Sequence, residues 1–198
     1  MKIEDEVRNA ETIGIGGHIR PDGDCVGACM ALYLYLRKVF PKKKTELFLE
    51  SPSDVFCYIK DLDKIHTDVS EEECRDGYFD VFIALDTAKE RLGAAQPLFD
   101  KARKTINIDH HVSNKGCGTV NYIDAQASST SELILDVLDE KKLDVEIAKA
   151  LYIGIAHDTG VFRYSNTSPK TLEAAAKLIA FGFDFSEILE KTFYEKTY

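Results

Sequence analysis

The segment FDVFIALD, residues 79–86, is an almost unbroken apolar run that ends on an aspartate. Such a run is typical of a strand in a parallel sheet, because helices cover both faces of these sheets. Shorter runs predict strands at 12–18, 45–50 and 105–111, and apolar residues at helical spacing predict a helix over 24–40. Strands and helices alternate here, which indicates an α/β fold with a mainly parallel sheet.

The second half of the chain has mainly helical patterns. Helices are predicted over 128–142, 144–160, 168–182 and 184–198. We therefore expect one α/β domain, with helices flanking a mainly parallel sheet and a helical C-terminal part. The less regular segments predict a short helix over 51–62, a helix over 94–104 and an extended, then looped segment over 118–128, with 64–77 left unassigned.

Side chains that bind metals follow three of the predicted strands. The residues are His18, Asp22 and Asp24 after the first strand, Asp86 at the end of 79–86, Asp109, His110 and His111 at the end of 105–111, and Asp158 before a glycine turn. Ligands of open parallel sheets bind beyond the carboxyl ends of the strands. We therefore expect these side chains to meet at one edge of the domain.

The ligand types indicate which ions would fit. Carboxylate and imidazole together suit Mn²⁺, Co²⁺, Fe²⁺ or Zn²⁺, whereas Mg²⁺ prefers oxygen alone. Asp22, Asp24, Asp86 and Asp158 bring four negative charges, which two divalent cations would balance. Two such ions about 3.5–4 Å apart are the usual arrangement for in-line attack on phosphorus.

Each residue also has a simpler interpretation. Asp86 alone could be a turn residue, Asp22 and Asp24 could cap the following helix, and His110 and His111 could be one core and one exposed histidine. The metal hypothesis is favoured because ligand type, strand-end position and charge agree across separate segments.

Composition excludes several classes of protein. A net charge of −9 argues against electrostatic binding of duplex nucleic acid, although a metal could attract a short anionic substrate. The polar N-terminus is no signal peptide, and no apolar run approaches the roughly 20 residues of a membrane span. Five scattered cysteines without a C-x-x-C pair indicate reduced thiols, so we expect a cytoplasmic protein with no membrane partner.

Four motifs in order resemble the DHH phosphoesterases over most of the chain. They are H-x-x-P-D-x-D-x-x-G at 18–27, Asp86 followed by RLG at 91–93, the triplet at 109–111, and DTGVFRYSNT at 158–167. SSTSEL at 128–133 also resembles the helix start that follows the triplet in this family. Within the family, the likeness is to the branch of nanoRNases and pAp phosphatases.

The resemblance implies a ligand set and roles for further residues. One metal would be held by His18, Asp22 and Asp86, and the second by Asp24, Asp86, His110 and Asp158, so that Asp86 bridges the pair. His111 would face the substrate phosphate as an acid or an electrostatic stabiliser, and Asp109 would orient a histidine. Arg163 would contact phosphate, with a solvated surface arginine as the equally weighted alternative.

The resemblance also implies an activity. A two-metal-activated hydroxide would hydrolyse short oligonucleotides, pAp (3′-phosphoadenosine 5′-phosphate) or a dinucleotide, with Mn²⁺ expected first and Co²⁺, Fe²⁺ or Mg²⁺ as other cofactors. The alternatives are an inorganic pyrophosphatase or exopolyphosphatase, and a non-catalytic nucleotide-binding module stabilised by metal. Members of this branch carry a C-terminal DHHA1 domain, so we expect residues 1–198 to be the DHH domain alone, ending at a linker helix. The sequence leaves open whether the protein forms a homodimer.

Overall fold

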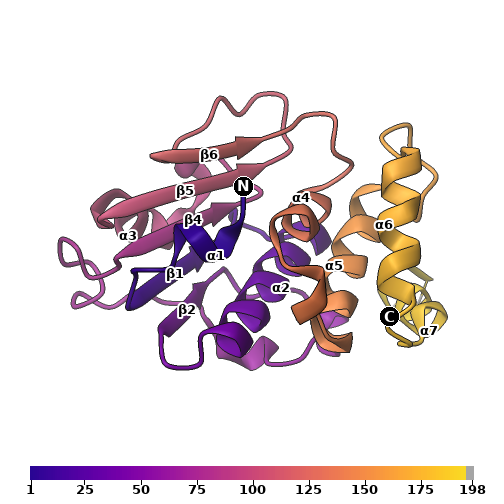
Figure 1. Cartoon of the computed structure of the whole chain (residues 1–198), viewed down its shortest axis with the longest axis horizontal. Helices are drawn as coiled ribbons and strands as arrows, with labels where there is room; N and C mark the ends of the chain where they lie inside the picture. Colours follow the sequence, from indigo (N-terminus) through magenta and orange to yellow (C-terminus); the bar gives the residue numbers. More distant parts are fainter. Residues whose placement is uncertain (195–198) are drawn as a thin grey trace.

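The computed structural model describes residues 1–194 and contains one sheet in which all strands are parallel (Figure 1). The strands are β1 (Thr12–Gly16), β2 (Lys44–Phe48), β3 (Ile65–His66), β4 (Val81–Leu85), β5 (Lys104–Asp109) and β6 (Val120–Ile123). They lie in the order β3-β2-β1-β4-β5-β6, and each neighbouring pair is parallel. The predicted fold class is therefore confirmed.

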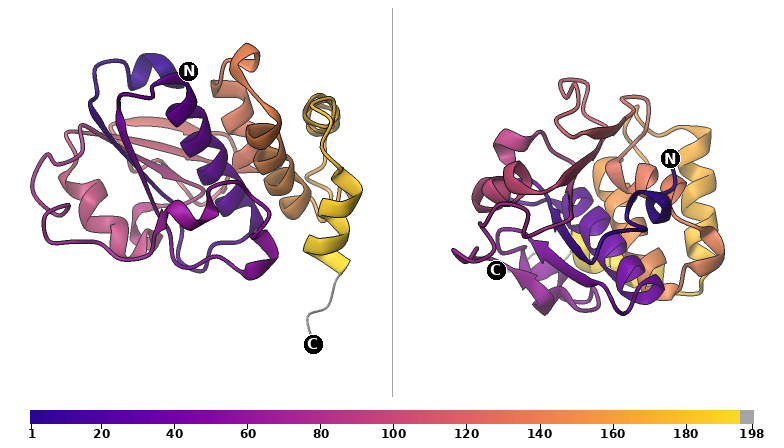
Figure 2. Two further views of the ribbon diagram at one scale, coloured as in Figure 1. Left: turned by 90° about the horizontal axis from the view of Figure 1, so that it is seen from below. Right: turned by 60° about the vertical axis from the view of Figure 1, so that its left-hand side comes forward.

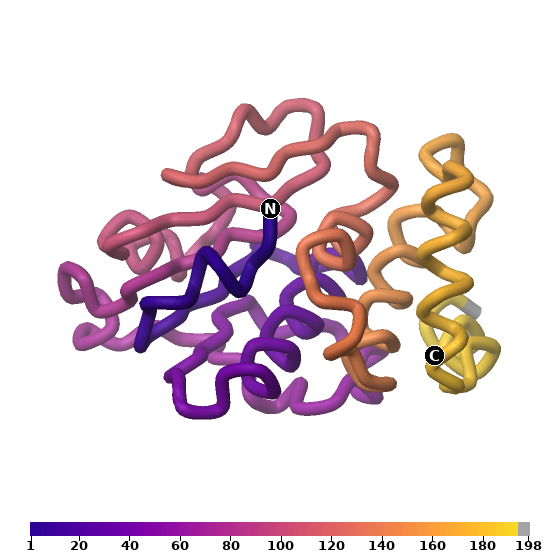
Figure 3. The backbone as a smooth tube through the Cα atoms, in the orientation of Figure 1, coloured from indigo at the N-terminus to yellow at the C-terminus, as the bar shows by residue number. Residues whose placement is uncertain are grey.

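Helices cover both faces of this sheet. They are α1 (Ile3–Glu6), α2 (Gly23–Val39), α3 (Gln96–Lys101), α4 (Thr130–Val137), α5 (Val145–Asp158), α6 (Pro169–Ile179) and α7 (Phe185–Leu189), which a π-helical turn, Glu190–Tyr194, extends. Figure 2 shows α2, α4 and α5 on one side of the sheet and α3 on the other, with α6 and α7 packed outside α5. The tube in Figure 3 shows the last helices at the end of the molecule farthest from the sheet.

The apolar core is divided by the sheet into two parts. Ile13, Ile15 and Ile83 belong to the larger cluster, with side chains of α2, α4 and α5. Phe82, the neighbour of Ile83 in β4, belongs to a smaller cluster on the opposite face with Phe99 of α3. Alternate residues of β4 thus enter opposite cores, which explains why its sequence is apolar throughout.

A close helix contact fixes α5 against α2. A β-carbon at Gly27 of α2 would lie only 2.6 Å from the carbonyl oxygen of Ala150 in α5, so the glycine lets the two backbones touch. A β-carbon at Gly23, one turn earlier in α2, would lie 2.5 Å from the ring of His157 near the end of α5. The helices therefore run antiparallel, and the start of α2 meets the end of α5.

The strand order reverses between β1 and β4. The chain leaves β1 for β2 on one side, and β4 lies on the other side, so the order of strands reverses at this pair. In open parallel sheets such a reversal marks the ligand crevice, at the carboxyl ends of the strands. His18 follows β1 and Asp86 follows β4 at this point.

Some elements differ from those predicted. The helix expected over 128–142 ends at Val137, because Leu138 is extended and Asp139 caps a separate 3-10 turn. The segment 51–62 forms no α-helix and contains the short turn Asp54–Phe56. The unassigned segment 64–77 includes the edge strand β3. The predicted helix over 184–198 is α-helical over Phe185–Leu189 and continues as a π-helical turn to Tyr194, and its last four positions lie outside the described residues.

Within the described part of the chain, no helix has both the length and the apolar character that crossing a membrane requires.

Candidate metal centre

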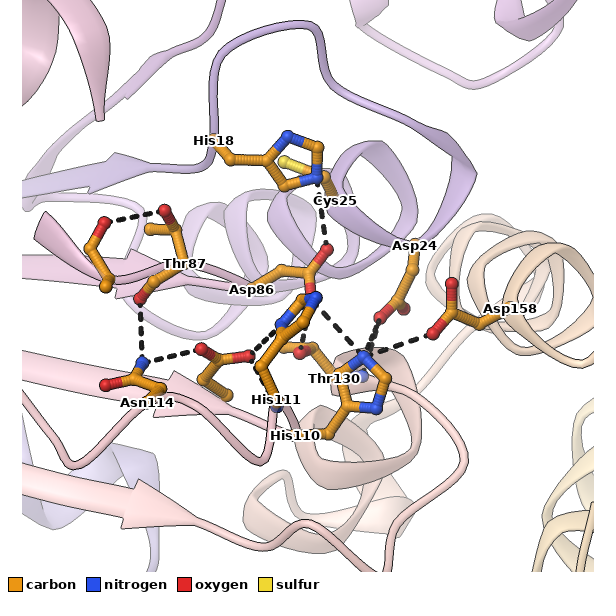
Figure 4. A network of polar contacts seen from close by, with 12 residues as sticks. His18, Asp24, Cys25, Asp86, Thr87, His110, His111, Asn114, Thr130 and Asp158 are labelled. Atoms are coloured by element: carbon orange, nitrogen blue, oxygen red, sulfur yellow. Dashed lines mark hydrogen bonds and ion pairs between the residues drawn. The ribbon is translucent and has the colours of Figure 1, made fainter. Parts of the chain in front are cut away.

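Asp86 lies at the centre of a network of polar side chains, and its two carboxylate oxygens face different partners (Figure 4). Oδ2 lies 3.4 Å from Nε2 of His18, and Oδ1 lies 3.7 Å from Nε2 of His110. The residue directly after β4 has a φ of +57°, a left-handed conformation that is uncommon for a residue with a side chain. Such strain is often found at functional sites. Asp86 thus stands between two groups of potential ligands.

His18 and Asp22 form the group on one side of Asp86. The His18 ring is buried, and its Nδ1 lies 2.8 Å from the carbonyl oxygen of Ile19, which only accepts hydrogen bonds. Nδ1 therefore carries a proton and donates it there, so Nε2 is the nitrogen that faces the carboxylates. That Nε2 lies 3.7 Å from Asp22, whose carboxylate also caps α2 by accepting from the backbone N–H groups of Asp24 and Cys25.

His110 gathers the group on the other side. Its Nε2 lies 3.1 Å from Asp158 and 3.9 Å from Asp24, in addition to its approach to Asp86. Asp158 is the last residue of α5 and Asp24 lies in the first turn of α2, so the antiparallel packing of these helices brings the two carboxylates together.

The start of α4 holds Asp24 in place. Its two carboxylate oxygens accept hydrogen bonds from the backbone N–H groups of Thr130, at 2.6 Å, and Ser131, at 2.9 Å. The Thr130 hydroxyl donates to Asp86 at 2.9 Å. These groups at the helix start are free to bond outward because helices leave their first N–H groups without internal partners. The sequence predicts a helix start here, but does not predict this contact.

His111 is oriented by a separate set of contacts. Its Nδ1–H donates to Asp109 at 2.7 Å, and the other oxygen of Asp109 accepts from the side-chain amide of Asn114. Asp109 is fully buried, whereas the His111 side chain is 41% exposed. The histidine is therefore held through Nδ1 while its side chain stays partly exposed.

The pKa values show a site that favours positive charge. Burial, together with the charges of Asp86 and Asp158, raises the pKa of Asp24 well above its usual range, and burial also raises that of Asp86. Burial would lower the pKa of His110, but the hydrogen bond to Asp158 and the nearby aspartates outweigh it and raise the value to about 9. Each group takes up a proton more readily than it would in water.

The donor set fits divalent cations. Within residues 1–194, ligand atoms that lie within 4.8 Å of one another form the groups His18–Cys25–Asp86, Asp22–His157–Asp158, Asp24–His110–Asp158 and Asp86–His110–His111. Carboxylate oxygen with imidazole nitrogen suits Mn²⁺, Co²⁺, Fe²⁺ or Zn²⁺. The raised pKa values mean that added positive charge stabilises this site, and a bound cation would supply that charge in place of protons.

Two members of these groups are absent from the sequence-based prediction. Cys25 is fully buried beside His18, and burial raises the pKa of its thiol well above the usual value. The His157 ring lies against Gly23 and between the rings of Phe56 and Phe193. Their positions next to Asp24 and Asp158 are the sequence signal that could have identified both.

Arg163 lies on the exposed surface. Its Nε donates to the carbonyl oxygen of Gly160 at 3.0 Å, within a turn where Gly160, Val161 and Phe162 all have positive φ angles. This contact ties the side chain to the loop after Asp158. Its predicted contact with phosphate stays a prediction.

Comparison with known proteins agrees with these features. The chain is 31% identical over 192 residues to the bifunctional oligoribonuclease and PAP phosphatase NrnA of Bacillus subtilis, covering 94% of this chain and 58% of the relative. The chain thus spans a little over half of the length of the curated relatives that it matches first.

Two solved structures share the fold. An exopolyphosphatase-related protein from Bacteroides fragilis superimposes with a TM-score of 0.86 at 23% identity, covering 98% of this chain and 60% of the other. The exonuclease RecJ bound to manganese gives 0.56 at 14% identity, covering 96% and 53%. Residues 12–155 match the DHH family, N-terminal domain, and these residues include the whole sheet and all of the site except His157, Asp158 and the residues after them. The chain therefore belongs to the DHH family.

Proposed function

We propose that this chain is a metal-dependent phosphoesterase that hydrolyses short oligonucleotides and pAp. The observation that carries the proposal is the position of Asp86, whose two oxygens face separate groups of nitrogen and oxygen donors. One carboxylate placed in this way suits a pair of cations with a shared ligand, the arrangement that serves in-line attack on phosphorus.

The proposed cofactors are two divalent cations, with Mn²⁺ as the first candidate and Co²⁺, Fe²⁺ or Mg²⁺ as others. His18, Asp22 and Asp86 would hold one, and Asp24, Asp86, His110 and Asp158 the other. The manganese bound to the exonuclease RecJ, which shares the fold, supports that choice. Bound cations would supply Lewis acidity, neutralising phosphoryl charge and lowering the pKa of a water molecule.

His111 is the proposed partner of the substrate phosphate. Asp109 accepts from its Nδ1–H, and this hydrogen bond raises the pKa of His111. A protonated ring would present Nε2–H to the crevice, where it can donate a hydrogen bond to a phosphoryl oxygen or a proton to the leaving oxygen. Asp109 then acts as a positioning residue, and Arg163 is proposed as an outer phosphate contact from the exposed loop after Asp158.

The substrate class rests on the names of the relatives. The Bacillus subtilis and Thermus thermophilus proteins are both named as bifunctional oligoribonuclease and PAP phosphatase. Both substrates are short and carry phosphate esters, so a compact site lined by metal-binding groups suits them better than it suits a long duplex.

The test is hydrolysis of pAp and of a dinucleotide RNA by the purified chain in Mn²⁺, followed by chromatography of the products. Pyrophosphate and polyphosphate are assayed in parallel. Asp86→Asn removes the shared charge with little change of shape, and Asp63→Asn, at an exposed residue of the 3-10 turn Leu62–Lys64, is the matched control. Changing an outer partner of a metal ligand already costs about 10–100-fold, so Asp86→Asn should lose more than about 100-fold.

Each outcome has a distinct meaning. Turnover of pAp or RNA that Asp86→Asn abolishes and Asp63→Asn retains supports the proposal. Turnover of pyrophosphate or polyphosphate alone would replace the substrate class by the second enzymatic alternative. Manganese binding without hydrolysis of any of the four substrates would favour a nucleotide-binding module and contradict the proposed activity.

A further inference from the structure

Cys25 lies in the first turn of α2, beside one of the two ligand groups. Its backbone N–H donates to Asp22 at 3.1 Å, so a proposed metal ligand fixes its position. The side chain is fully buried, and Figure 4 shows the sulfur next to the His18 ring. The established family motifs that this sequence contains do not explain why a thiol stands here.

The geometry brings three different donor types to one point. The ligand atoms of His18, Cys25 and Asp86 lie within 4.8 Å of one another, and the nitrogen and oxygen of the pair His18–Asp86 are 3.4 Å apart. Ligands bound to one ion at about 2.0–2.3 Å lie at most about 4.6 Å apart. The His18–Asp86 distance of 3.4 Å satisfies this limit, and the 4.8 Å that bounds the whole group exceeds it by only about 0.2 Å. His18 and Asp86 are almost completely buried as well, and water competes little for these atoms.

Packing alone does not require a sulfur at this position. The Cys25 sulfur lies against Gly17, where an added β-carbon would come within 2.3 Å of it. Cys29, one turn later in α2, is equally buried and lies against the same glycine, at 3.1 Å from such a β-carbon. Among the described residues, Cys25 joins a ligand group and Cys29 does not. The two cysteines therefore share the packing role and differ in their access to the site.

We propose that Cys25 is a further ligand of the cation held by His18 and Asp86, so that this position prefers a thiophilic ion such as Zn²⁺, Co²⁺ or Fe²⁺ to Mn²⁺. The inference rests on the metal-dependent function proposed above and refines its choice of ion at one of the two positions. Thiolate sulfur favours such ions, whereas carboxylates suit Mn²⁺. When the sulfur binds, an S–metal bond replaces the S–H bond and one proton passes to solvent.

The test is a titration of the metal-free chain with Co²⁺, followed by absorption spectroscopy and calorimetry. A sulfur-to-cobalt charge-transfer band in the near ultraviolet is expected for the wild type and for Cys29→Ala. Cys25→Ala should lose the band and bind the first Co²⁺ at least about tenfold more weakly. In the Cys25→Ala variant, the affinity for Mn²⁺ should fall less than the affinity for Co²⁺ does. Cys25→Ser, which keeps the size of the side chain, gives the same comparison should the alanine variant not fold.

Two results would overturn the inference. One is cobalt bound by the wild type without a sulfur band, and the other is a band that persists in both variants of Cys25. Hydrolysis assays in Mn²⁺ separate this failure from that of the proposed function. Nucleotide turnover without a sulfur band would contradict only the proposed role of Cys25. A sulfur band without nucleotide turnover would contradict only the proposed phosphoesterase activity.

Discussion

At the scale of single residues, the site buries carboxyl groups, although burial disfavours their charged form. Asp86 and Asp24 are buried, and burial raises the pKa of each. An acid with a raised pKa in the folded state holds a proton that the unfolded chain has already released. Stability therefore falls as the pH rises past the usual aspartate value of 3.8.

Asp86→Asn should therefore act in opposite directions on activity and on stability. In chelator at neutral pH we expect the variant to melt at the same temperature as the wild type or higher, because an amide carries no buried charge and still accepts from the Thr130 hydroxyl. Melting followed by circular dichroism from about pH 4 to 7 should show a smaller loss of stability in the variant. A clearly lower melting temperature at pH 7 would mean that the charged form stabilises the metal-free fold.

Asp109→Asn tests how His111 is positioned. The substitution removes the charge that accepts from Nδ1–H, while leaving the ligands of both groups unchanged. We expect kcat on pAp to fall by about 10–100-fold with little change in KM, since outer partners orient groups that act in the transition state. Manganese affinity, measured by calorimetry, should stay within about twofold. A large loss of affinity would show that Asp109 supports the metal instead.

At the scale of elements, the contact between α2 and α5 brings Asp24 and Asp158 together around His110. Alanine is favoured over glycine in a helix by about 1 kcal/mol, but a β-carbon at Gly27 would meet backbone atoms that cannot rotate away. Gly27→Ala is therefore expected to lower the free energy of unfolding by about 1–3 kcal/mol in urea titrations. Glu173→Ala, at an exposed position of α6, should change it by less than about 0.5 kcal/mol. Equal effects of the two substitutions would contradict close packing at Gly27.

The carboxylate of Glu4 links the N-terminal helix α1 to two other parts of the fold. Glu4 accepts hydrogen bonds from the Tyr35 hydroxyl of α2 and, at 2.9 Å, from Lys142, and these contacts lower its pKa. A lowered pKa stabilises the fold above the usual value of 4.5, and this stability is lost as the pH falls through the folded value. Glu4→Gln should reduce the drop in the urea midpoint between about pH 5.5 and 3.5, whereas the exposed control Glu71→Gln should not. An unchanged pH dependence would mean that Glu4 is not coupled to folding.

Secondary-structure elements also show which parts of the fold and the site can be predicted from the sequence. Apolar runs and their terminal Asp and His residues predict β1, β4 and β5 and the meeting of their ends, because parallel strands share one carboxyl edge. The contact of Asp24 with Thr130 joins residues 106 positions apart, and no local pattern encodes it. Similarly, the break of the predicted helix 128–142 at Leu138 coincides with a hydrogen bond from the Asp139 N–H to Tyr35 of another helix. Tertiary contacts of this kind override local helix preference.

At the scale of the whole molecule, a chain with a net charge of −9 concentrates carboxylates at one edge of its sheet. Asp22 and Asp24 lie together at the start of α2, whereas Asp86 and Asp158 come from two other segments, so folding itself creates most of the repulsion among these carboxylates. Cations that bind these groups only in the folded state stabilise it by RT ln(1 + [L]/Kd), about 2.7 kcal/mol at a hundredfold excess over Kd. For a chain of this length, that corresponds to a rise of about 5–10 °C in Tm.

We therefore expect Mn²⁺ to raise the Tm by this amount and Mg²⁺ to raise it less, because His18 and His110 supply nitrogen donors that Mg²⁺ accepts poorly. Calorimetric melting with NaCl at matched ionic strength separates specific binding from screening, which should produce only a small shift. Asp86→Asn should lose most of the response to Mn²⁺, since its amide cannot offer a charged oxygen to both groups. Equal shifts with Mn²⁺ and Mg²⁺ would mean that the imidazoles take no part in binding, and an equal response in the variant would mean that Asp86 does not link the two groups.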